Sequence, residues 1–176
     1  MCRKRHQEVN MKKLIYLDNA ATTKTSEEVV AAMLPYFTEY YGNPSSVYEF
    51  ASESKKAVSN ARRTIAETLG AQENEIYFTA GGSEADNWAL KATAEAYQSK
   101  GKHIITSTIE HHAILHTCAY LEKKGFEITY VNVDENGKVK LDELEAAIRP
   151  DTILISIMTA NNEIGTIQPV REIGRI

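Results

Sequence analysis

The chain has 176 residues, of which 43% are hydrophobic and 25% charged, which is ordinary for one globular domain or a large piece of a bigger protein. Its net charge of −4 argues against nucleic acid or an anionic membrane surface as a partner. No apolar run approaches the roughly 18 residues that cross a bilayer, and Cys2 and Cys118 form no disulfide framework, so we expect a cytoplasmic protein.

The N-terminal residues are predicted to lie outside the fold. Residues 1–10 are charged and precede no apolar stretch, so they do not form a signal peptide. "MKKLIYLDNAATT" from Met11 is typical of a natural start. We therefore predict an N-terminal extension at 1–10, an N-terminal segment at 11–25, and a domain over 26–176.

The first helix is predicted to begin after Ser26, an N-cap candidate, and to bend at Pro35. "YYGNPSS" at 40–46 is a turn-rich loop. A second helix is predicted over 54–69, closed by Gly70.

From residue 76 onwards, strand-like and helix-like runs alternate. Strands are predicted at 76–79, 103–107, 127–133 and 152–158, and helices at 83–99, 113–124 and 141–149, with another opening at Pro169. This alternation predicts α/β architecture with a mainly parallel sheet. Ligands of such sheets bind in the loops beyond the carboxyl ends of the strands.

The loop "TAGGSEADN" has the layout of a phosphate cradle. Gly81 and Gly82 let a ligand approach the backbone, and Ser83 offers a hydroxyl and an N–H at a helix N-terminus, where the macrodipole favours an anion. No GK[ST] follows, which excludes a lysine-bearing P-loop. The residues alone leave open a tight turn in which Ser83 only caps the helix.

The loop "STIEHHAIL" contains histidines of two kinds. His112 and His116 have the i, i+4 spacing of a zinc pair, but no carboxylate or cysteine stands at matching spacing, so an ordinary helix surface is preferred. His111, at a strand end, can lie flat on an aromatic ligand or act as an acid or base near neutral pH. Cys118 is predicted to be a buried small hydrophobe.

The loop "TANNEIGT" follows the predicted buried strand at 152–158. The amides of Asn161 and Asn162 can bond a ligand oxygen without adding charge. Paired asparagines are also frequent turn formers, and that alternative stays open.

Six segments in order resemble the class V, fold type I pyridoxal-phosphate enzymes, specifically the NifS/IscS-like cysteine desulfurases. They are "YLDNAATT" (16–23), "YGNPSS" (41–46), "FTAGGSEADNWAL" (78–90), "HIITSTIEHHAIL" (103–115), "GFEITYVNVDENGKV" (125–139) and "SIMTANNEIGTIQPV" (156–170). The resemblance implies an α/β/α sandwich over 26–176 that is part of the large, pyridoxal-phosphate-binding domain of fold type I.

The resemblance also implies roles for single residues. Gly82 and Ser83 would bind the phosphate of pyridoxal 5'-phosphate, His111 would stack on its pyridine ring as a catalytic residue, and Asn162 would bond near its phenolic oxygen.

Two further segments would lie near the substrate. Asn19, Ala20 and Ala21 would lie close to the substrate entrance, and the Asn43 loop would lie near the active site of a partner subunit.

The implied reaction removes sulfur from L-cysteine and leaves alanine, while a protein cysteine becomes a persulfide. The sulfur would pass to an acceptor protein such as an iron–sulfur scaffold, or to tRNA thiolation. The chain would form a homodimer or self-associate.

This sequence departs from the family in several places. Ser83 stands where threonine is commoner, and Tyr48 and Ala51 stand where the family often has histidine and glycine. The Ser-x-His-Lys motif with the Schiff-base lysine, and the sulfur-accepting cysteine loop, do not occur in these 176 residues. By itself the chain is therefore expected to show no desulfurase activity. Alternatives are a piece of another class V enzyme, such as selenocysteine lyase, or a non-catalytic remnant that dimerises or binds a partner.

Overall fold

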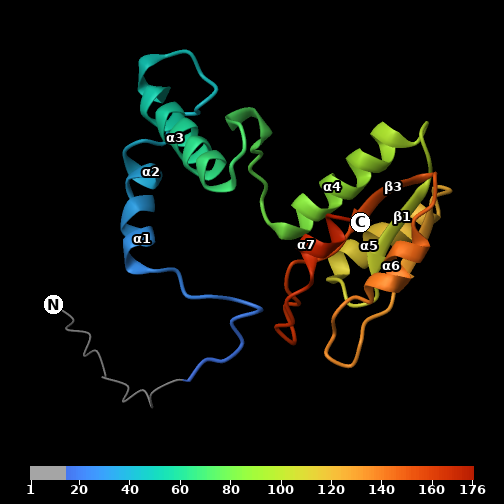
Figure 1. Ribbon diagram of the computed structural model, residues 1–176. Coiled ribbons are helices and arrows are strands. Elements are labelled where there is room, and N and C mark those ends of the chain that lie inside the picture. The colour runs from blue at the N-terminus through green and yellow to red at the C-terminus, as the bar shows by residue number, and fades with distance from the viewer. Residues whose placement is uncertain (1–14) are drawn as a thin grey trace. The chain divides into compact units, whose positions relative to one another are not determined.

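The computed structural model describes residues 15–176 and divides into two compact units, one up to Asn60 and one from Ala61 to Ile176 (Figure 1). The predicted extension at 1–10 and the start at Met11 lie outside the described residues. No helix within residues 15–176 is both long and apolar enough to cross a membrane.

The unit up to Asn60 begins with two short helices, α1 (Glu27–Met33) and α2 (Pro35–Thr38). Ser26 is the N-cap of α1, as predicted, and its hydroxyl accepts a hydrogen bond from the amide of Val29 at 3.3 Å. Pro35 opens α2 because a proline has no N–H to continue the preceding helix. The predicted bend is therefore a break between two helices.

The turn-rich loop at 40–46 is confirmed and is held against the residues that follow it. The amide oxygen of Asn43 accepts from the backbone N–H of Ser45 at 2.9 Å, and the hydroxyl of Ser54 donates to the carbonyl of Tyr40 at 2.6 Å. Gly42 has no room for a side chain, because a Cβ there would stand 2.9 Å from the Cα of Ala51. The 3-10 helix η1 (Glu49–Ala51) then leads into α3 (Ser52–Leu69), which ends in the second unit.

The second unit contains a sheet of three parallel strands in the order β2-β1-β3. The strands are β1 (His103–Ser107), β2 (Glu127–Val131) and β3 (Thr152–Ser156). The other elements are η2 (Glu73–Glu75), α4 (Gly82–Tyr97), α5 (His112–Glu122), α6 (Leu141–Ala147) and α7 (Val170–Ile173). The predicted strands over 127–133 and 152–158 each end two residues early.

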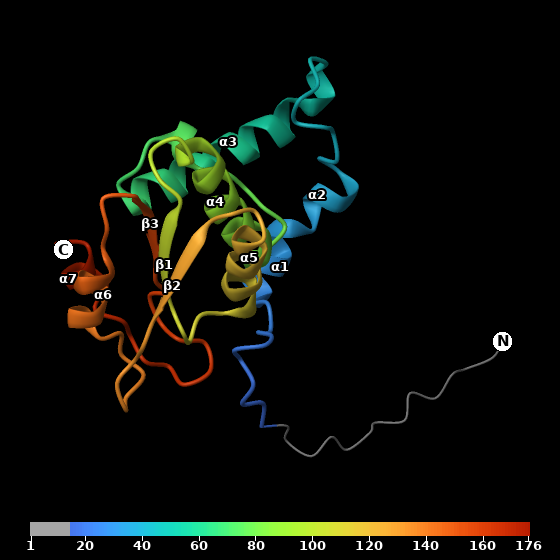
Figure 2. The ribbon, with the colours of Figure 1, turned by 90° about the vertical axis from the view of Figure 1, so that its right-hand side faces the viewer.

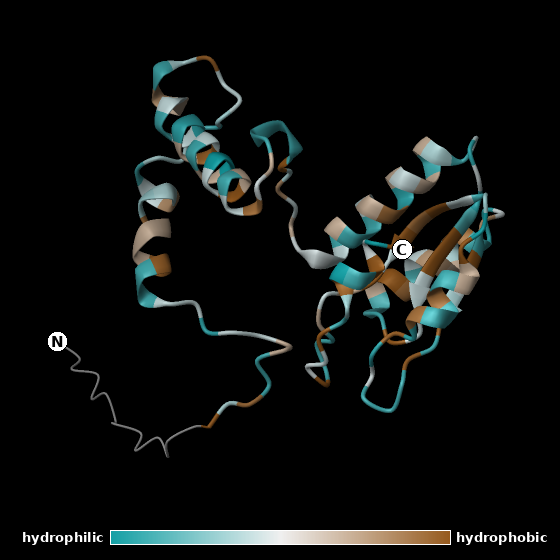
Figure 3. Ribbon diagram, viewed as in Figure 1, coloured by the Kyte–Doolittle hydropathy of each residue, from teal (hydrophilic) through white to brown (hydrophobic). Residues whose placement is uncertain are grey.

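Helices cover both faces of this sheet, with α4 and α5 on one face and α6 and α7 on the other (Figure 2). Adjacent side chains of β1 point to opposite faces, as the pleat of a strand requires: Ile104 packs with α4 and α5, and Ile105 packs with α6. Stretches of these strands are brown, which marks hydrophobic residues, in Figure 3. Cys118 is fully buried in the first of these clusters, as predicted, and burial raises the pKa of its thiol to about 11.

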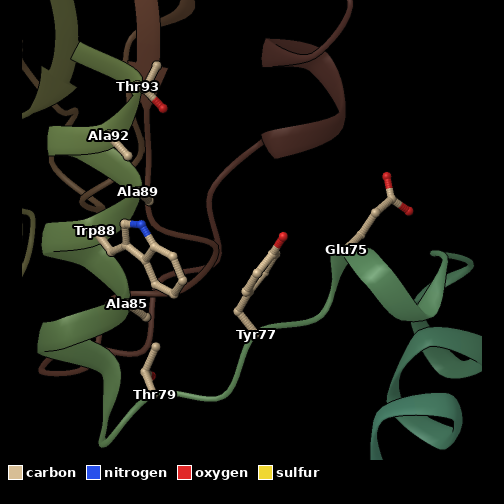
Figure 4. Close-up of a pocket in the computed structure, with 8 residues that line it drawn as sticks. All are labelled: Glu75, Tyr77, Thr79, Ala85, Trp88, Ala89, Ala92 and Thr93. Atoms are coloured by element: carbon tan, nitrogen blue, oxygen red, sulfur yellow. The ribbon is translucent and has the colours of Figure 1, made fainter. Parts of the chain in front are cut away.

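The prediction of a strand at 76–79 is wrong for the described structure. This segment is extended but pairs with no strand within residues 15–176. Its contacts are made to helices instead: Arg62 donates to the carbonyl of Ile76, and the rings of Tyr77 and Trp88 meet edge to face at 5.2 Å (Figure 4). β-like residues form a strand only where a neighbouring backbone supplies hydrogen bonds, which local sequence does not reveal.

Candidate functional site at the carboxyl end of the sheet

A cavity of about 430 Å³ in the second unit is lined by α4 and α5, from their N-terminal ends as far as Lys91 and Tyr120. Ser83 from the start of α4 and His111 from the start of α5 both line it. The other lining residues come from the same two helices: Asn87, Lys91, His112, Ala113, His116, Thr117 and Tyr120. The structure thus brings together two residues that were predicted from separate loops.

The N-terminal tip of α4 is open to a ligand. Its N-cap is Gly81, and Ser83 is the second residue of the helix, so Ser83 is not the N-cap. The amides of Gly82 and Ser83 lie in the first helical turn, where an α-helix supplies no carbonyl partner. A Cβ added at Gly81 or at Gly82 would meet nothing within 4 Å.

One acidic side chain also lies at this tip. Glu84 is in the first turn of α4, and its carboxylate accepts a hydrogen bond from the backbone N–H of Ala80 at 2.6 Å. This bond ties the carboxylate to the segment before the helix. An anion at the tip would meet the helix amides and also the repulsion of this charge.

His111 is the N-cap of α5, and its ring is fixed by that position. Its Nδ1 accepts a hydrogen bond from the amide of Ala113 at 3.1 Å. A ring nitrogen that accepts carries no proton, so the neutral ring has its proton on Nε2. The ring therefore presents a flat face and an Nε2–H donor for further contacts.

Asn161 and Asn162 have different roles in the loop after β3. Asn161 is buried, and its oxygen accepts from the amides of Glu163 at 2.9 Å and Ile164 at 3.0 Å. It therefore forms the turn, as the turn-forming interpretation expects. Asn162 is exposed, and its amide nitrogen donates to the carboxylate of Glu163 at 2.9 Å.

Glu110 is a residue that the sequence reasoning missed. Its side chain is buried between the ends of two strands, where one carboxylate oxygen accepts from the hydroxyl of Ser107 at 2.8 Å and from the amide of Met158 at 2.9 Å. Burial is the main reason why its pKa is raised, although both hydrogen bonds oppose that shift. The position of a glutamate directly before His111 was the only signal in the sequence.

The two histidines that follow His111 in the chain, His112 and His116, lie on the exposed face of α5. The rings of His112 and His116 stack with their centres 5.3 Å apart. On the facing helix, Lys91 donates to the amide oxygen of Asn87 at 2.7 Å, and its ammonium lies 4.8 Å from the ring centre of Tyr120. Within residues 15–176, no three histidine, cysteine, aspartate or glutamate residues are arranged to hold a metal ion.

Two other predicted site residues of the second unit do not line the cavity. Asn162 is not among its lining residues, and Gly82 only precedes Ser83 in the chain. Asn19, Ala20 and Ala21 form an exposed turn in the first unit, where the amide of Ala21 donates to the carbonyl of Asp18 at 3.2 Å.

Comparisons with known proteins agree with this fold. Residues 15–176 match the family described as aminotransferase class-V. The chain is 65% identical over 164 residues to the cysteine desulfurase IscS of Methanosarcina thermophila, which covers 93% of this chain and 41% of that protein. It is 57% identical over 166 residues to the cysteine desulfurase IscS of Clostridium botulinum (strain Kyoto / Type A2), over 94% of this chain and 42% of that protein.

Solved structures give the same result. A NifS-like protein aligns with a TM-score of 0.89 and 45% identity, over 92% of this chain and 44% of that chain. The structure of SspA in complex with cysteine aligns with a TM-score of 0.86 and 42% identity, over 91% of this chain and 46% of that chain.

The chain belongs to the aminotransferase class-V family. Within that family it is similar to NifS/IscS-like cysteine desulfurases, which confirms the resemblance and the α/β/α sandwich fold expected from it. The chain spans about two fifths of the length of the curated relatives named above.

Proposed function

We propose that this chain supplies the phosphate-binding and ring-binding part of a pyridoxal-phosphate site in a cysteine desulfurase. The observation that carries the proposal is the single cavity that Ser83 and His111 share, with the open tip of α4 beside it. Membership of the class-V family and similarity to named cysteine desulfurases support the choice of cofactor and reaction.

The residues at this cavity fit the cofactor's chemistry. A phosphate dianion needs several donors, and the amides of Gly82 and Ser83, the Ser83 hydroxyl and the dipole of the 16-residue helix α4 supply them. The open space in front of Gly82 lets the phosphate approach the backbone closely. The carboxylate of Glu84 opposes an anion here, but its bond to the amide of Ala80 holds it to the preceding segment.

Each residue of the chain would then have one task. Gly82 and Ser83 would hold the phosphate, and the flat face of the His111 ring would orient the pyridine ring. His111 would also hold a proton at Nε2, because its Nδ1 is occupied by the amide of Ala113. Asn162, exposed after β3, would bond the cofactor's phenolic oxygen. When bound, pyridoxal phosphate supplies an electron sink for the reaction of an amino acid.

The substrate and partners extend the same proposal. L-cysteine would be the substrate, which the relatives' names and the cysteine complex of SspA support. Asn19, Ala20 and Ala21 would lie at the substrate entrance, and residues 26–176 would form part of the large domain. The sulfur acceptor would be a protein such as an iron–sulfur scaffold, and the working protein would be a cytoplasmic homodimer.

The phosphate site can be tested with a ligand that carries no aldehyde, so that surface lysines do not react. We expect pyridoxamine 5'-phosphate to bind the 176-residue chain and to shift the NMR signals of the Gly82 and Ser83 amides and the His111 ring. Ser83→Ala should weaken this binding about tenfold, because a hydrogen bond to a charged group contributes about 1.5–3 kcal/mol.

The matched control is Ser99→Ala, because Ser99 is exposed and lies just after the opposite end of the same helix. It should leave the affinity unchanged. Inorganic phosphate should compete with the ligand, and pyridoxine without a phosphate should not bind detectably. If pyridoxamine phosphate shifts none of the Gly82, Ser83 and His111 signals, the proposed site is wrong.

A further inference from the structure

We propose that Glu110 and Asn161 are positioning residues of this site, which cross-link the loop after β1 to the loop after β3 and so orient His111 and Asn162. The inference rests on the proposed function for what His111 and Asn162 would touch. The cross-links themselves are independent of any ligand. Neither residue is proposed to contact the cofactor.

Glu110 makes the first cross-link. The residue is only 7% exposed, and one of its carboxylate oxygens accepts from two donors, one at the end of β1 and one beyond the end of β3. The hydroxyl of Ser107, at the end of β1, donates at 2.8 Å, and the amide of Met158, two residues beyond β3, donates at 2.9 Å. The carboxylate therefore joins the carboxyl ends of two neighbouring strands.

Asn161 makes the second cross-link, from the opposite loop. It is 8% exposed, and its amide nitrogen donates to the carbonyl of Ile109 at 3.0 Å. Its oxygen accepts from the backbone amides of Glu163 and Ile164. One buried side chain thus closes the turn after β3 and attaches it to the residue next to Glu110.

The two cross-links share a pattern in the chain. In each loop, a buried residue directly precedes an exposed residue that would contact the cofactor. Glu110 precedes His111, and Asn161 precedes Asn162. Successive side chains in an extended backbone point to opposite sides, and His111 is extended. Burying Glu110 therefore turns His111 outward, where its Nδ1 meets the amide of Ala113.

The expected consequence is that the His111 ring has a single tautomer before any ligand binds. The strands alone do not fix this ring, because β1 ends at Ser107 and the loop before α5 has one further backbone bond to the sheet, from the amide of Thr108 to the carbonyl of Val131 at 3.1 Å. Without the Glu110 carboxylate, the amide of Met158 and the hydroxyl of Ser107 would lose a buried acceptor. The loop would then relax, and the contact between His111 and Ala113 would form for only part of the time.

The test measures the tautomer of His111 in the ligand-free 176-residue chain by NMR of ¹⁵N-labelled histidines, with His111→Asn to assign the signals. The wild-type ring should carry its proton on Nε2. Glu110→Ala and Asn161→Ala should each give a mixture of tautomers. Glu110→Gln should keep the wild-type state, because its amide oxygen still accepts from Ser107 and Met158. Glu135→Ala is the control and should change nothing, because Glu135 is exposed in the turn at 134–137.

A wild-type mixture of tautomers, or an unchanged His111 in folded Glu110→Ala, would overturn the inference. Glu110→Gln behaving like Glu110→Ala would also count against it, because charge rather than geometry would then matter. If Glu110→Ala does not fold, Ser107→Ala decides, because it removes one donor and keeps the carboxylate. It should raise the minor tautomer, and an unchanged ratio would refute the cross-link.

Affinity for pyridoxamine 5'-phosphate gives a second measurement. Glu110→Ala should weaken binding about tenfold, which corresponds to about 1.4 kcal/mol, and Glu110→Gln should stay within about twofold of wild type. If the wild-type chain binds no pyridoxamine phosphate but shows the expected tautomers, the proposed function fails and the positioning of His111 stands. If the wild-type chain binds pyridoxamine phosphate but the tautomers are the same in all variants, the proposed function stands and the positioning of His111 fails.

Discussion

The two ends of the parallel sheet place a histidine in opposite situations. At the amino end, His103 is fully buried and bonds through both ring nitrogens, to the hydroxyl of Thr152 at 2.7 Å and of Thr129 at 2.8 Å. At the carboxyl end, His111 is exposed and uses Nδ1 for a helix cap, and it lines the cavity between α4 and α5. One histidine closes a network, and the other is available to a ligand.

The same contrast holds for the backbone and the charges. At the amino end, Gly101 packs so tightly on the carbonyl of Asp151 that a Cβ would stand 2.1 Å from that oxygen. Arg149 bonds the carboxylates of Glu127 and Asp151 beside it. At the carboxyl end, Gly81 faces open space. One end of this sheet is thus held by packed backbone and paired charges, and the other is left open, where ligands of α/β sheets bind.

Gly101→Ala should cause the largest loss of stability at the amino end of the sheet. The added methyl group collides with backbone, which cannot rotate away as a side chain can, so we expect a loss of about 3 kcal/mol in the free energy of unfolding. Urea unfolding measures it. Gly81→Ala is the matched control, because its Cβ meets nothing within 4 Å and its φ of 166° is ordinary extended backbone. Equal losses in the free energy of unfolding in both variants would show that the two ends of the sheet do not differ in this way.

Thr152→Val should have the next largest effect. The Thr152 hydroxyl is the partner of both His103 Nδ1 and the backbone amide of Arg149 at 2.8 Å. Removing it leaves buried polar groups unsatisfied, at about 1–3 kcal/mol. Thr108→Val is the control, since Thr108 is exposed directly after the carboxyl end of β1. A stability of Thr152→Val equal to that of wild type would show that the network at His103 contributes nothing.

Lowering the pH should reduce the free energy of unfolding through His103, at the amino end of the sheet. Burial, reinforced by the charge of Arg149, lowers the pKa of His103, against the attraction of Asp151 and Glu127. Below the ordinary histidine pKa of about 6.5, the unfolded chain binds a proton at this histidine that the folded chain does not bind. The free energy of unfolding should therefore fall as pH drops below about 6.5, by at most about 1.4 kcal/mol per pH unit for one proton, and the loss should level off below the folded pKa.

His103→Gln should flatten this pH dependence in thermal unfolding measured from pH 7 to 5.5. Identical slopes in the variant and the wild type would rule out His103 as the cause. Glu110 at the carboxyl end works in the opposite direction, because burial raises its pKa and its protonation at lower pH favours the folded chain.

Arg149→Gln should have the smallest effect at the amino end. Its two ion pairs, 2.6 Å to Glu127 and 2.8 Å to Asp151, are largely exposed, so water and salt screen them. We expect a small drop in Tm that shrinks further in high salt. Arg63→Gln, which removes a single exposed pair with Glu73, should lower Tm less. A large, salt-independent loss for Arg149→Gln would mean that the pairs act as a buried network.

Local sequence predicted the parts of this protein that neighbours along the chain decide. Ser26 caps a helix, Pro35 starts one, and Gly70 follows α3 in the left-handed conformation with φ of 66°. Six motifs in order also identified the family before any fold was known. Capping bonds and proline geometry extend over a few residues, and the order of motifs is written directly in the chain, so a single sequence is enough to predict them.

Only the tertiary structure decided the features that depend on distant residues. Residues 76–79 have strand-like side chains but no neighbouring strand among the described residues, and Glu110 has an ordinary acidic sequence context but is buried between two strand ends. Ser83 and His111 are 28 positions apart and share a cavity because α4 and α5 pack together on one face of the sheet. Burial and strand pairing are set by residues far along the chain, and those contacts exist only once it has folded.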